Sequence, residues 1–126
     1  MHHFREEVVS LLSQNNQRVI IKLAQWNRID LFNIIYNHTS DLLFHTSILD
    51  AASMFGNLHL VQFLFQKHAS YSNAALSNAA RNGHLQVVVY LVENCRDLSL
   101  SIARDHARSH GKHQVVEYLD EAIHNQ

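Results

Sequence analysis

The chain has 126 residues, of which 47% are hydrophobic and 17% are charged, a balance typical of a globular domain and not of a disordered segment. Ten basic and eleven acidic side chains give a formal net charge of −1, so we expect no binding of nucleic acid or of an anionic membrane. The single cysteine, Cys95, excludes an internal disulfide, and no apolar run approaches the roughly 18 residues of a membrane span. These features predict an intracellular, cytoplasmic protein.

The first predicted element is a helix over residues 4–13. Its run Glu7-Val8-Val9-Ser10-Leu11-Leu12 matches Gln86-Val87-Val88-Val89-Tyr90-Leu91 column for column. We interpret this helix as a half-unit that covers the N-terminal end of a stack of repeats.

A turn column then recurs along the chain. Gly56, Gly83 and Gly111 follow one another at nearly equal intervals, and Asn27 stands close to one such interval before Gly56. Glycine, followed by asparagine, suits the left-handed backbone at which many helices end. The regular interval predicts a stacked-repeat protein whose units bury their apolar faces against their neighbours.

A helix is predicted on each side of the turn column. In the preceding helix, small residues stand four and three positions before the column in most copies, which favours close packing; these residues are Leu23, Ala52, Ala79 and Ala107, then Ala24, Ser53, Ala80 and Arg108. In the following helix, the positions four, five, seven and eight after the column form an apolar stripe. They are Leu31, Leu60, Val87 and Val115; Phe32, Val61, Val88 and Val116; Ile34, Phe63, Tyr90 and Tyr118; Ile35, Leu64, Leu91 and Leu119.

Polar positions mark the surface and the end of the predicted stack. The position three after the turn column is always polar, as Asp30, His59, Gln86 and Gln114. The last helix carries Glu117 in the column of Val89 and Asp120 in the column of Phe65 and Val92, and the next residue is the acidic Glu121. A polar outer face on a terminal repeat stops a stack from growing, so we interpret residues 99–126 as a capping repeat.

The pattern resembles the ankyrin repeat over residues 19–122. The closest copy is Ala79–Glu93, followed by Gly111–Leu119 and Ala52–Leu64, whereas Asn27–Phe32 is degenerate. The resemblance implies an all-α solenoid of helix-turn-helix repeats that holds another protein and has no catalytic activity or cofactor. The domain is then single, spanning 1–126, with a half-repeat at 4–16 and repeats at 17–45, 46–73, 74–98 and 99–126.

Two departures from the family pattern concern the start of each unit and the link between units. No copy has the family's Thr-Pro-Leu-His opening, and each unit is several positions shorter than a usual ankyrin repeat. The missing residues fall at Lys67–Asn73 and Asn94–Leu100, where the family places a β-turn finger. We therefore expect reduced fingers, with an unrelated array of helical hairpins as the alternative fold.

The resemblance implies a concave groove lined by the residues just before the turn column. The partner-binding residues expected there are Gln25, Trp26, Met54, Phe55, Arg81, Asn82, Ser109 and His110. Large apolar and aromatic residues grouped with an arginine are typical of a binding hot spot. The alternative interpretation is that Trp26 and Phe55 fill the core. A monomer is expected, with a homodimer contact through Val89 and Phe65 left open.

The eleven histidines raise the question of a metal site. His106 and His110 are four residues apart on one predicted helix, with His113 after the turn, but no Cys-x-x-Cys or His-Glu-x-x-His motif supplies further ligands. We therefore expect no metal site and no enzyme. The alternatives left open are a small inhibitor or adaptor of an enzyme, including an effector delivered into a host cell, and a metal-responsive protein.

Overall fold

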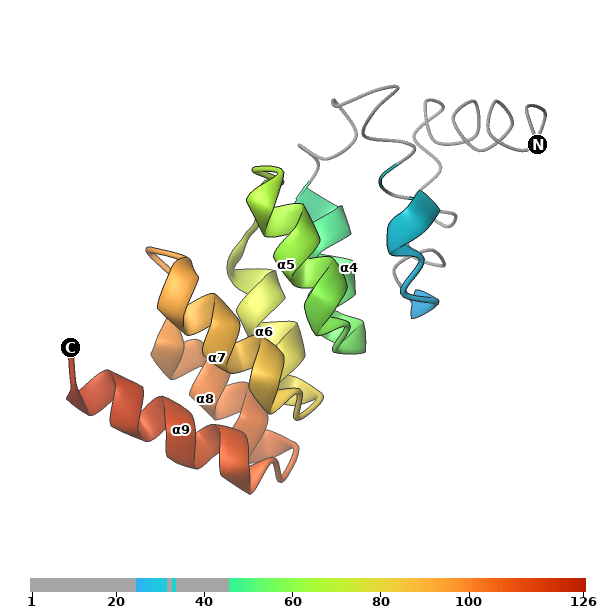
Figure 1. Ribbon diagram of the computed structural model, residues 1–126. Helices are drawn as coiled ribbons and strands as arrows, with labels where there is room; N and C mark the ends of the chain where they lie inside the picture. The colour runs from blue at the N-terminus through green and yellow to red at the C-terminus, as the bar shows by residue number, and fades with distance from the viewer. Residues whose placement is uncertain (1–24, 32, 34–45) are drawn as a thin grey trace, which may run out of the picture.

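The computed structural model describes residues 25–31, 33 and 46–126 (Figure 1). The predicted half-repeat at 4–16 and most of the repeat at 17–45 lie outside these residues. Helices follow one another along 46–126, and no strand occurs in the described residues, so an all-α fold is confirmed for them. The helices are α4 (Thr46–Phe55), α5 (Leu58–Gln66), α6 (Asn73–Arg81), α7 (Leu85–Asn94), α8 (Leu100–Ser109) and α9 (His113–His124).

The predicted turn column closes each helical hairpin. Gly56, Gly83 and Gly111 have φ angles of 75°, 77° and 69°, and Asn27 has a φ angle of 56°. After each glycine, the next backbone N–H donates to the carbonyl of the alanine four positions before the glycine. These bonds join Asn57 to Ala52 at 3.2 Å, His84 to Ala79 at 2.9 Å and Lys112 to Ala107 at 2.9 Å. The left-handed conformation of the glycine therefore lets the next N–H donate to a carbonyl that would otherwise lack a partner at the helix end.

The helices before the turns form an inner row. Figure 1 shows α4, α6 and α8 behind α5, α7 and α9, and α6 packs against both α4 and α8 more extensively than the outer helices pack against one another. The small residues Ala52, Ala79 and Ala107 are fully buried, as predicted. Ser53 is also buried, because its hydroxyl donates to the Leu49 carbonyl at 2.8 Å.

The helices after the turns bury the predicted apolar stripe. Its fully buried positions are Leu60, Val61, Leu64, Val88, Leu91 and Leu119, whereas Phe63, Tyr90 and Tyr118 are partly buried against the same core. Asp30, His59, Gln86 and Gln114 are exposed, as their polarity predicts. None of the described helices is long and apolar enough to cross a membrane.

Short loops at 67–72 and 95–99 connect the repeats, within the stretches Lys67–Asn73 and Asn94–Leu100 where reduced fingers were expected. Serines begin the next inner helices: the Ser72 hydroxyl accepts from Ala74 N–H at 3.1 Å, and that of Ser99 accepts from Ile102 N–H at 3.4 Å. Each serine is also tied to the preceding repeat. Ser72 donates its hydroxyl to Asp50 at 2.7 Å, and Ser99 donates its N–H to Asn73 Oδ1 at 2.8 Å.

The last repeat ends in charged side chains. Arg104 donates Nη1–H to Asp120 at 3.2 Å, which joins α8 to α9, and its Nε lies 3.6 Å from Asp105. Glu117 and Glu121 are exposed. This ion pair was not part of the sequence prediction, although Asp120 was among the residues expected on the outer face.

Candidate functional site

From Met54 on, the predicted partner-binding residues lie at the C-terminal ends of the inner helices, and Gln25 and Trp26 directly precede the turn residue Asn27. Trp26 has 60% of its surface exposed, whereas Met54 and Phe55 are half-buried and Arg81 is partly buried. The remaining predicted residues are all exposed: Gln25, Asn82, Ser109 and His110. The structure therefore leaves these positions available to a partner to different degrees.

The alternative that Trp26 and Phe55 fill the core holds for only one of them. Phe55 packs against the buried cluster, together with Leu58 of the following helix. Trp26 is among the most exposed large apolar residues of the described chain. A substitution at Phe55 is expected to disturb packing, whereas a substitution at Trp26 removes exposed surface.

Hydrogen bonds between repeats fix the backbone of this region. The Met54 carbonyl accepts from Asn82 Nδ2 at 3.4 Å and lies 3.0 Å from His84 Nε2, so we assign Nε2 as the donor. Asn82 Nδ2 also donates to the Asn78 carbonyl at 2.9 Å. Asn82 is one of the predicted partner-binding residues, whereas His84 is not and stands directly after the turn residue Gly83. These bonds fix the position of the C-terminal end of α4 relative to that of α6.

Arg81 is the cation expected to anchor a carboxylate. Its guanidinium donates to Asn78 Oδ1 at 3.1 Å, which uses one of its several N–H groups and holds its direction. Arg81 therefore presents an oriented positive charge close to the Gly83 turn.

The ring of His110, the residue that caps the C-terminal end of α8, interacts with the backbone of that helix. His110 Nδ1 lies 3.0 Å from the His106 carbonyl, and both residues are exposed. No group of three His, Cys, Asp or Glu side chains in the described part of the chain is placed to hold a metal ion. The α8 histidines thus carry no argument for a metal-responsive protein.

The structure extends the predicted site, which included Met54, Arg81 and Ser109, along the same side of the inner helices. The side of α6 opposite its buried residues consists of Ala74, Ser77, Asn78 and Arg81. The matching side of α8, one repeat later, consists of Ile102, Asp105, His106 and Ser109, and that of α4 includes Asp50 and Met54. We call the residues named in these two sentences the inner face. Helical spacing could have found them, because they stand two, five, six and nine positions before the glycine.

Charges of both signs lie on the inner face. Asp50 and Asp105 are acidic and Arg81 is basic, so this face has no single-sign field. Burial raises the pKa of the Asp50 carboxyl, and the hydrogen bonds from Ser72 offset part of that rise. The Asp50 carboxylate therefore mainly accepts hydrogen bonds from Ser72, which join α4 to the start of α6.

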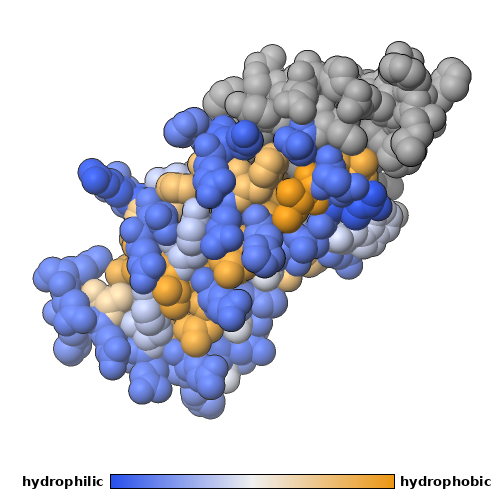
Figure 2. All heavy atoms as spheres, viewed as in Figure 1, coloured by the Kyte–Doolittle hydropathy of each residue, from blue (hydrophilic) through white to orange (hydrophobic). Residues whose placement is uncertain are grey.

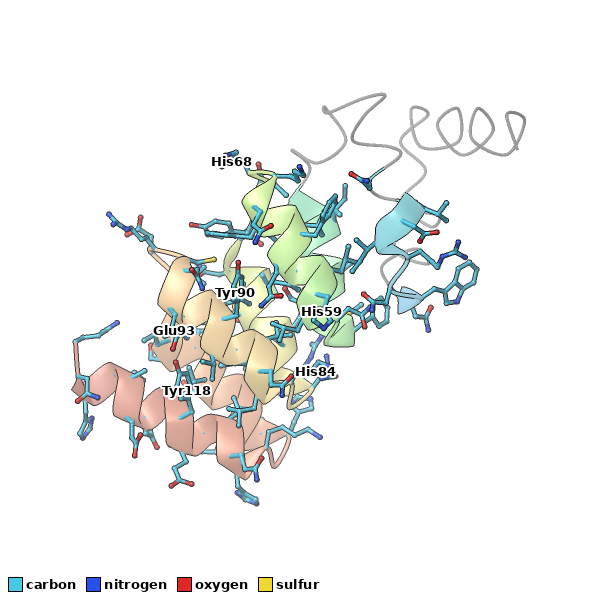
Figure 3. All side chains as sticks on the ribbon, viewed as in Figure 1. His59, His68, His84, Tyr90, Glu93 and Tyr118 are labelled. Carbon is cyan, nitrogen blue, oxygen red and sulfur yellow. The ribbon has the colours of Figure 1, made fainter. Side chains whose placement is uncertain are left out.

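The outer helices present a different surface. Figure 2 looks onto this side and shows apolar patches separated by hydrophilic residues. The partly buried Phe63, Tyr90 and Tyr118 contribute apolar surface from successive outer helices. Burial raises the pKa of the Tyr118 hydroxyl, and the charge of the nearby Glu93 raises it further (Figure 3). Val89 is half-buried, and Phe65 packs on Tyr71 and Tyr90. The homodimer contact through Val89 and Phe65 stays a prediction.

Comparison with known proteins gives one match. Residues 49–92, which run from α4 to α7, match the family model described as ankyrin repeats (many copies). No curated protein and no solved structure matches the chain. The matched segment contains the two turns at Gly56 and Gly83 and nearly all of the copy Ala79–Glu93.

Proposed function

We propose that this chain, whose residues 49–92 match the ankyrin-repeat family model, binds a partner protein across the inner face and Trp26. Ankyrin repeats are generally protein–protein interaction modules and are generally non-catalytic. The proposal assigns the contact to Trp26, Met54 and Arg81 at its centre. Asn82, Ser109, His110 and Gln25 form the polar surroundings.

The distribution of exposed apolar surface carries this proposal. Among the described residues, the large hydrophobic side chains that are exposed are Trp26, at 60%, and Ile102, at 50%. Ile102 lies on the inner face. Trp26 directly precedes the turn residue Asn27, in the column that Phe55 and Asn82 occupy before the later turns. Large aromatic and aliphatic side chains left in water by the fold are typical of interaction surfaces.

Rigidity is the second support. The bonds from Asn82 and His84 to the Met54 carbonyl fix neighbouring repeats, and Asn78 holds Arg81. A surface that is already ordered loses little conformational entropy on binding. The partner is therefore recognised by a preformed face, with Arg81 directed at a carboxylate and Trp26 and Ile102 covered by apolar groups. A partner enzyme held in this way would make the chain an inhibitor or an adaptor.

A matched pair of variants tests the proposal. The inner-face variant Trp26→Ala/Met54→Ala/Arg81→Ala is compared with the outer-helix variant His59→Ala/Gln86→Ala/Gln114→Ala, in which all three residues are exposed. Circular dichroism first establishes that both are folded. Proteins captured by the immobilised chain are then identified and quantified by mass spectrometry.

We expect a partner that the wild type and the outer-helix variant retain and the inner-face variant loses. A partner that only the outer-helix variant loses would place binding on α5, α7 and α9 and contradict the proposal. Phe55→Ala is left out of the variant because Phe55 packs against the core.

A further inference from the structure

A hollow of about 800 Å3 lies at the edge of the stack opposite the turns. Figure 3 shows this separation, with His68 at the loop edge and His84 at the turn edge. The C-terminal ends of α5 and α7 and the loop between α5 and α6 form the hollow. We call it the aromatic hollow, and the described residues that line it are Phe65, Gln66, His68, Ala69, Ser70, Tyr71, Tyr90 and Asn94.

Three aromatic rings from different segments form its apolar wall. The ring centre of Phe65 is 5.8 Å from that of Tyr90, and the two planes are nearly perpendicular at 87°. The Tyr71 ring centre is 6.3 Å from Phe65 with an angle of 35°. The Tyr71 hydroxyl accepts from Arg96 N–H at 3.4 Å, which ties the loop to the end of α7. The rings thus form a corner whose walls are held by neighbouring repeats.

Apart from the buried Ala69, the remaining lining is polar, with His68 among it, but carries no Asp, Glu, Lys or Arg among the described residues. Gln66, Ser70 and Asn94 supply amide and hydroxyl groups, and the Asn94 amide is oriented by its bond to the Tyr90 carbonyl at 2.8 Å. A charged ligand would leave water here without an opposite charge to replace it. The composition therefore favours an uncharged ligand, in contrast to the inner face with Asp50 and Arg81.

We propose that the aromatic hollow binds an uncharged, proline-rich segment of another protein in the polyproline II conformation. Such a segment has no internal hydrogen bonds, so its carbonyls seek donors such as the Tyr90 hydroxyl and the Gln66 amide. Its saturated rings pack on aromatic faces, and its preformed helix loses little entropy on docking. None of these 126 residues is a proline, so they do not supply the ligand themselves.

This second site is independent of the proposed function, because its residues and those of the inner face do not overlap. The test uses synthetic oligoproline peptides with blocked ends, one uniform and one with two polar residues between prolines, carrying a fluorophore for anisotropy measurements. A Gly/Ser peptide of equal length is the negative control. A peptide containing trimethyl-lysine probes the other ligand that aromatic rings recognise, a quaternary ammonium.

Two variants in the same repeat column make the test specific. Tyr90→Leu removes one wall of the hollow, whereas Tyr118→Leu changes the matching position of the next repeat, outside the hollow. We expect oligoproline to bind with a dissociation constant below about 1 mM, to weaken about tenfold or more with Tyr90→Leu and to change less than about twofold with Tyr118→Leu. Asn94→Ala, at an exposed lining residue, gives a second reading if Tyr90→Leu does not fold, and we expect it to weaken binding.

Three results would overturn the proposal. The first is no saturable binding of either oligoproline peptide to the wild type at millimolar concentration. The second is an equal loss with Tyr90→Leu and Tyr118→Leu, or no loss with Asn94→Ala when Tyr90→Leu is unfolded. The third is tighter binding of the trimethyl-lysine peptide, which would assign the hollow to a cation.

Discussion

The repeats formed by α4 to α7 and the repeat formed by α8 and α9 differ at equivalent positions, which are buried in the former and charged and at least partly exposed in the latter. Leu49 and Leu76 are fully buried between neighbouring inner helices, but the matching residue in α8 is Arg104, with its side chain 26% exposed. In a second such column, Ser53 and Ala80 are buried, but Arg108 is exposed. The position of a residue in the repeat therefore does not determine its burial by itself. Its burial also depends on whether a neighbouring repeat packs against it.

The turns show the same difference. Gly56 is covered by the His84 ring of the next repeat, and an added Cβ would overlap that ring; at Gly83 a Cβ would lie 2.9 Å from Lys112 Cδ. At Gly111 a Cβ would meet nothing within 4 Å. All three glycines have a positive φ, but a Cβ would overlap a ring only at Gly56, because the Lys112 side chain near Gly83 is flexible and can move aside.

The largest difference is expected between Leu76→Ala and Arg104→Ala. Leu76 is fully buried, so its truncation leaves a cavity and should lower the free energy of unfolding by about 2–5 kcal/mol. Arg104→Ala removes a partly exposed ion pair with Asp120 and should cost less than about 1 kcal/mol. Urea unfolding followed by circular dichroism measures both. Equal losses would mean that the terminal repeat is as tightly packed as the interior.

A smaller difference is expected between Gly56→Ala and Gly111→Ala. Both introduce a Cβ at positive φ, which costs about 1–2 kcal/mol, and Gly56→Ala must also displace His84. The double variant Gly56→Ala/His84→Ala removes the overlap, so its loss of stability should be less than the sum of the single losses. Strictly additive values from urea unfolding would show that His84 does not restrict Gly56.

A further contrast separates the two residues that follow these turns. His84 bonds the Met54 carbonyl across the repeat boundary, so His84→Ala should lower the free energy of unfolding by about 1 kcal/mol. Lys112 reaches Gly83 only with its aliphatic stem, so Lys112→Ala should cost less than about 0.5 kcal/mol. The two variants are compared by the same urea titration, and the reverse order would contradict the assigned bond.

The smallest expected effect at neutral pH concerns Cys95 at the end of α7. Burial raises the pKa of its thiol from 9.0 to about 11, and a hydrogen bond with Tyr71 offsets a little of this rise. Because the unfolded thiol ionises first, the stability it contributes is complete below about pH 9 and falls as the pH rises toward 11. Alkylation at pH 9 should accelerate strongly in urea. Equal rates in the folded and unfolded chain would contradict this pKa.

Much of the fold was predictable because each repeat encodes its own hairpin. The turn at Asn27, Gly56, Gly83 and Gly111 follows from backbone preference, and the structure gives all four a positive φ. The buried stripe follows from helical spacing. What spacing could not supply were contacts that depend on the packed arrangement, such as the His84 bond to Met54 and the Arg104 pair with Asp120.

The candidate site was predictable only in part, for a similar reason. Counting back from the turn found Met54 and Arg81 but stopped before Ile102, which lies two helical turns earlier on the same face. The aromatic hollow escaped because Tyr71 belongs to the loop, outside the repeating columns, and meets Phe65 only when the chain folds back. Features built from loops need the three-dimensional arrangement to be found.

Hydrogen–deuterium exchange of the chain with and without a captured partner tests the central claim most directly, because it reports the contact surface without substitutions. We expect the partner to slow exchange at the ends of α4 and α6, around Met54 and Arg81, and in the first turns of α8 near Ile102. The outer helices α5, α7 and α9 should exchange as in the free chain. Slower exchange confined to those outer helices would contradict binding through the inner face.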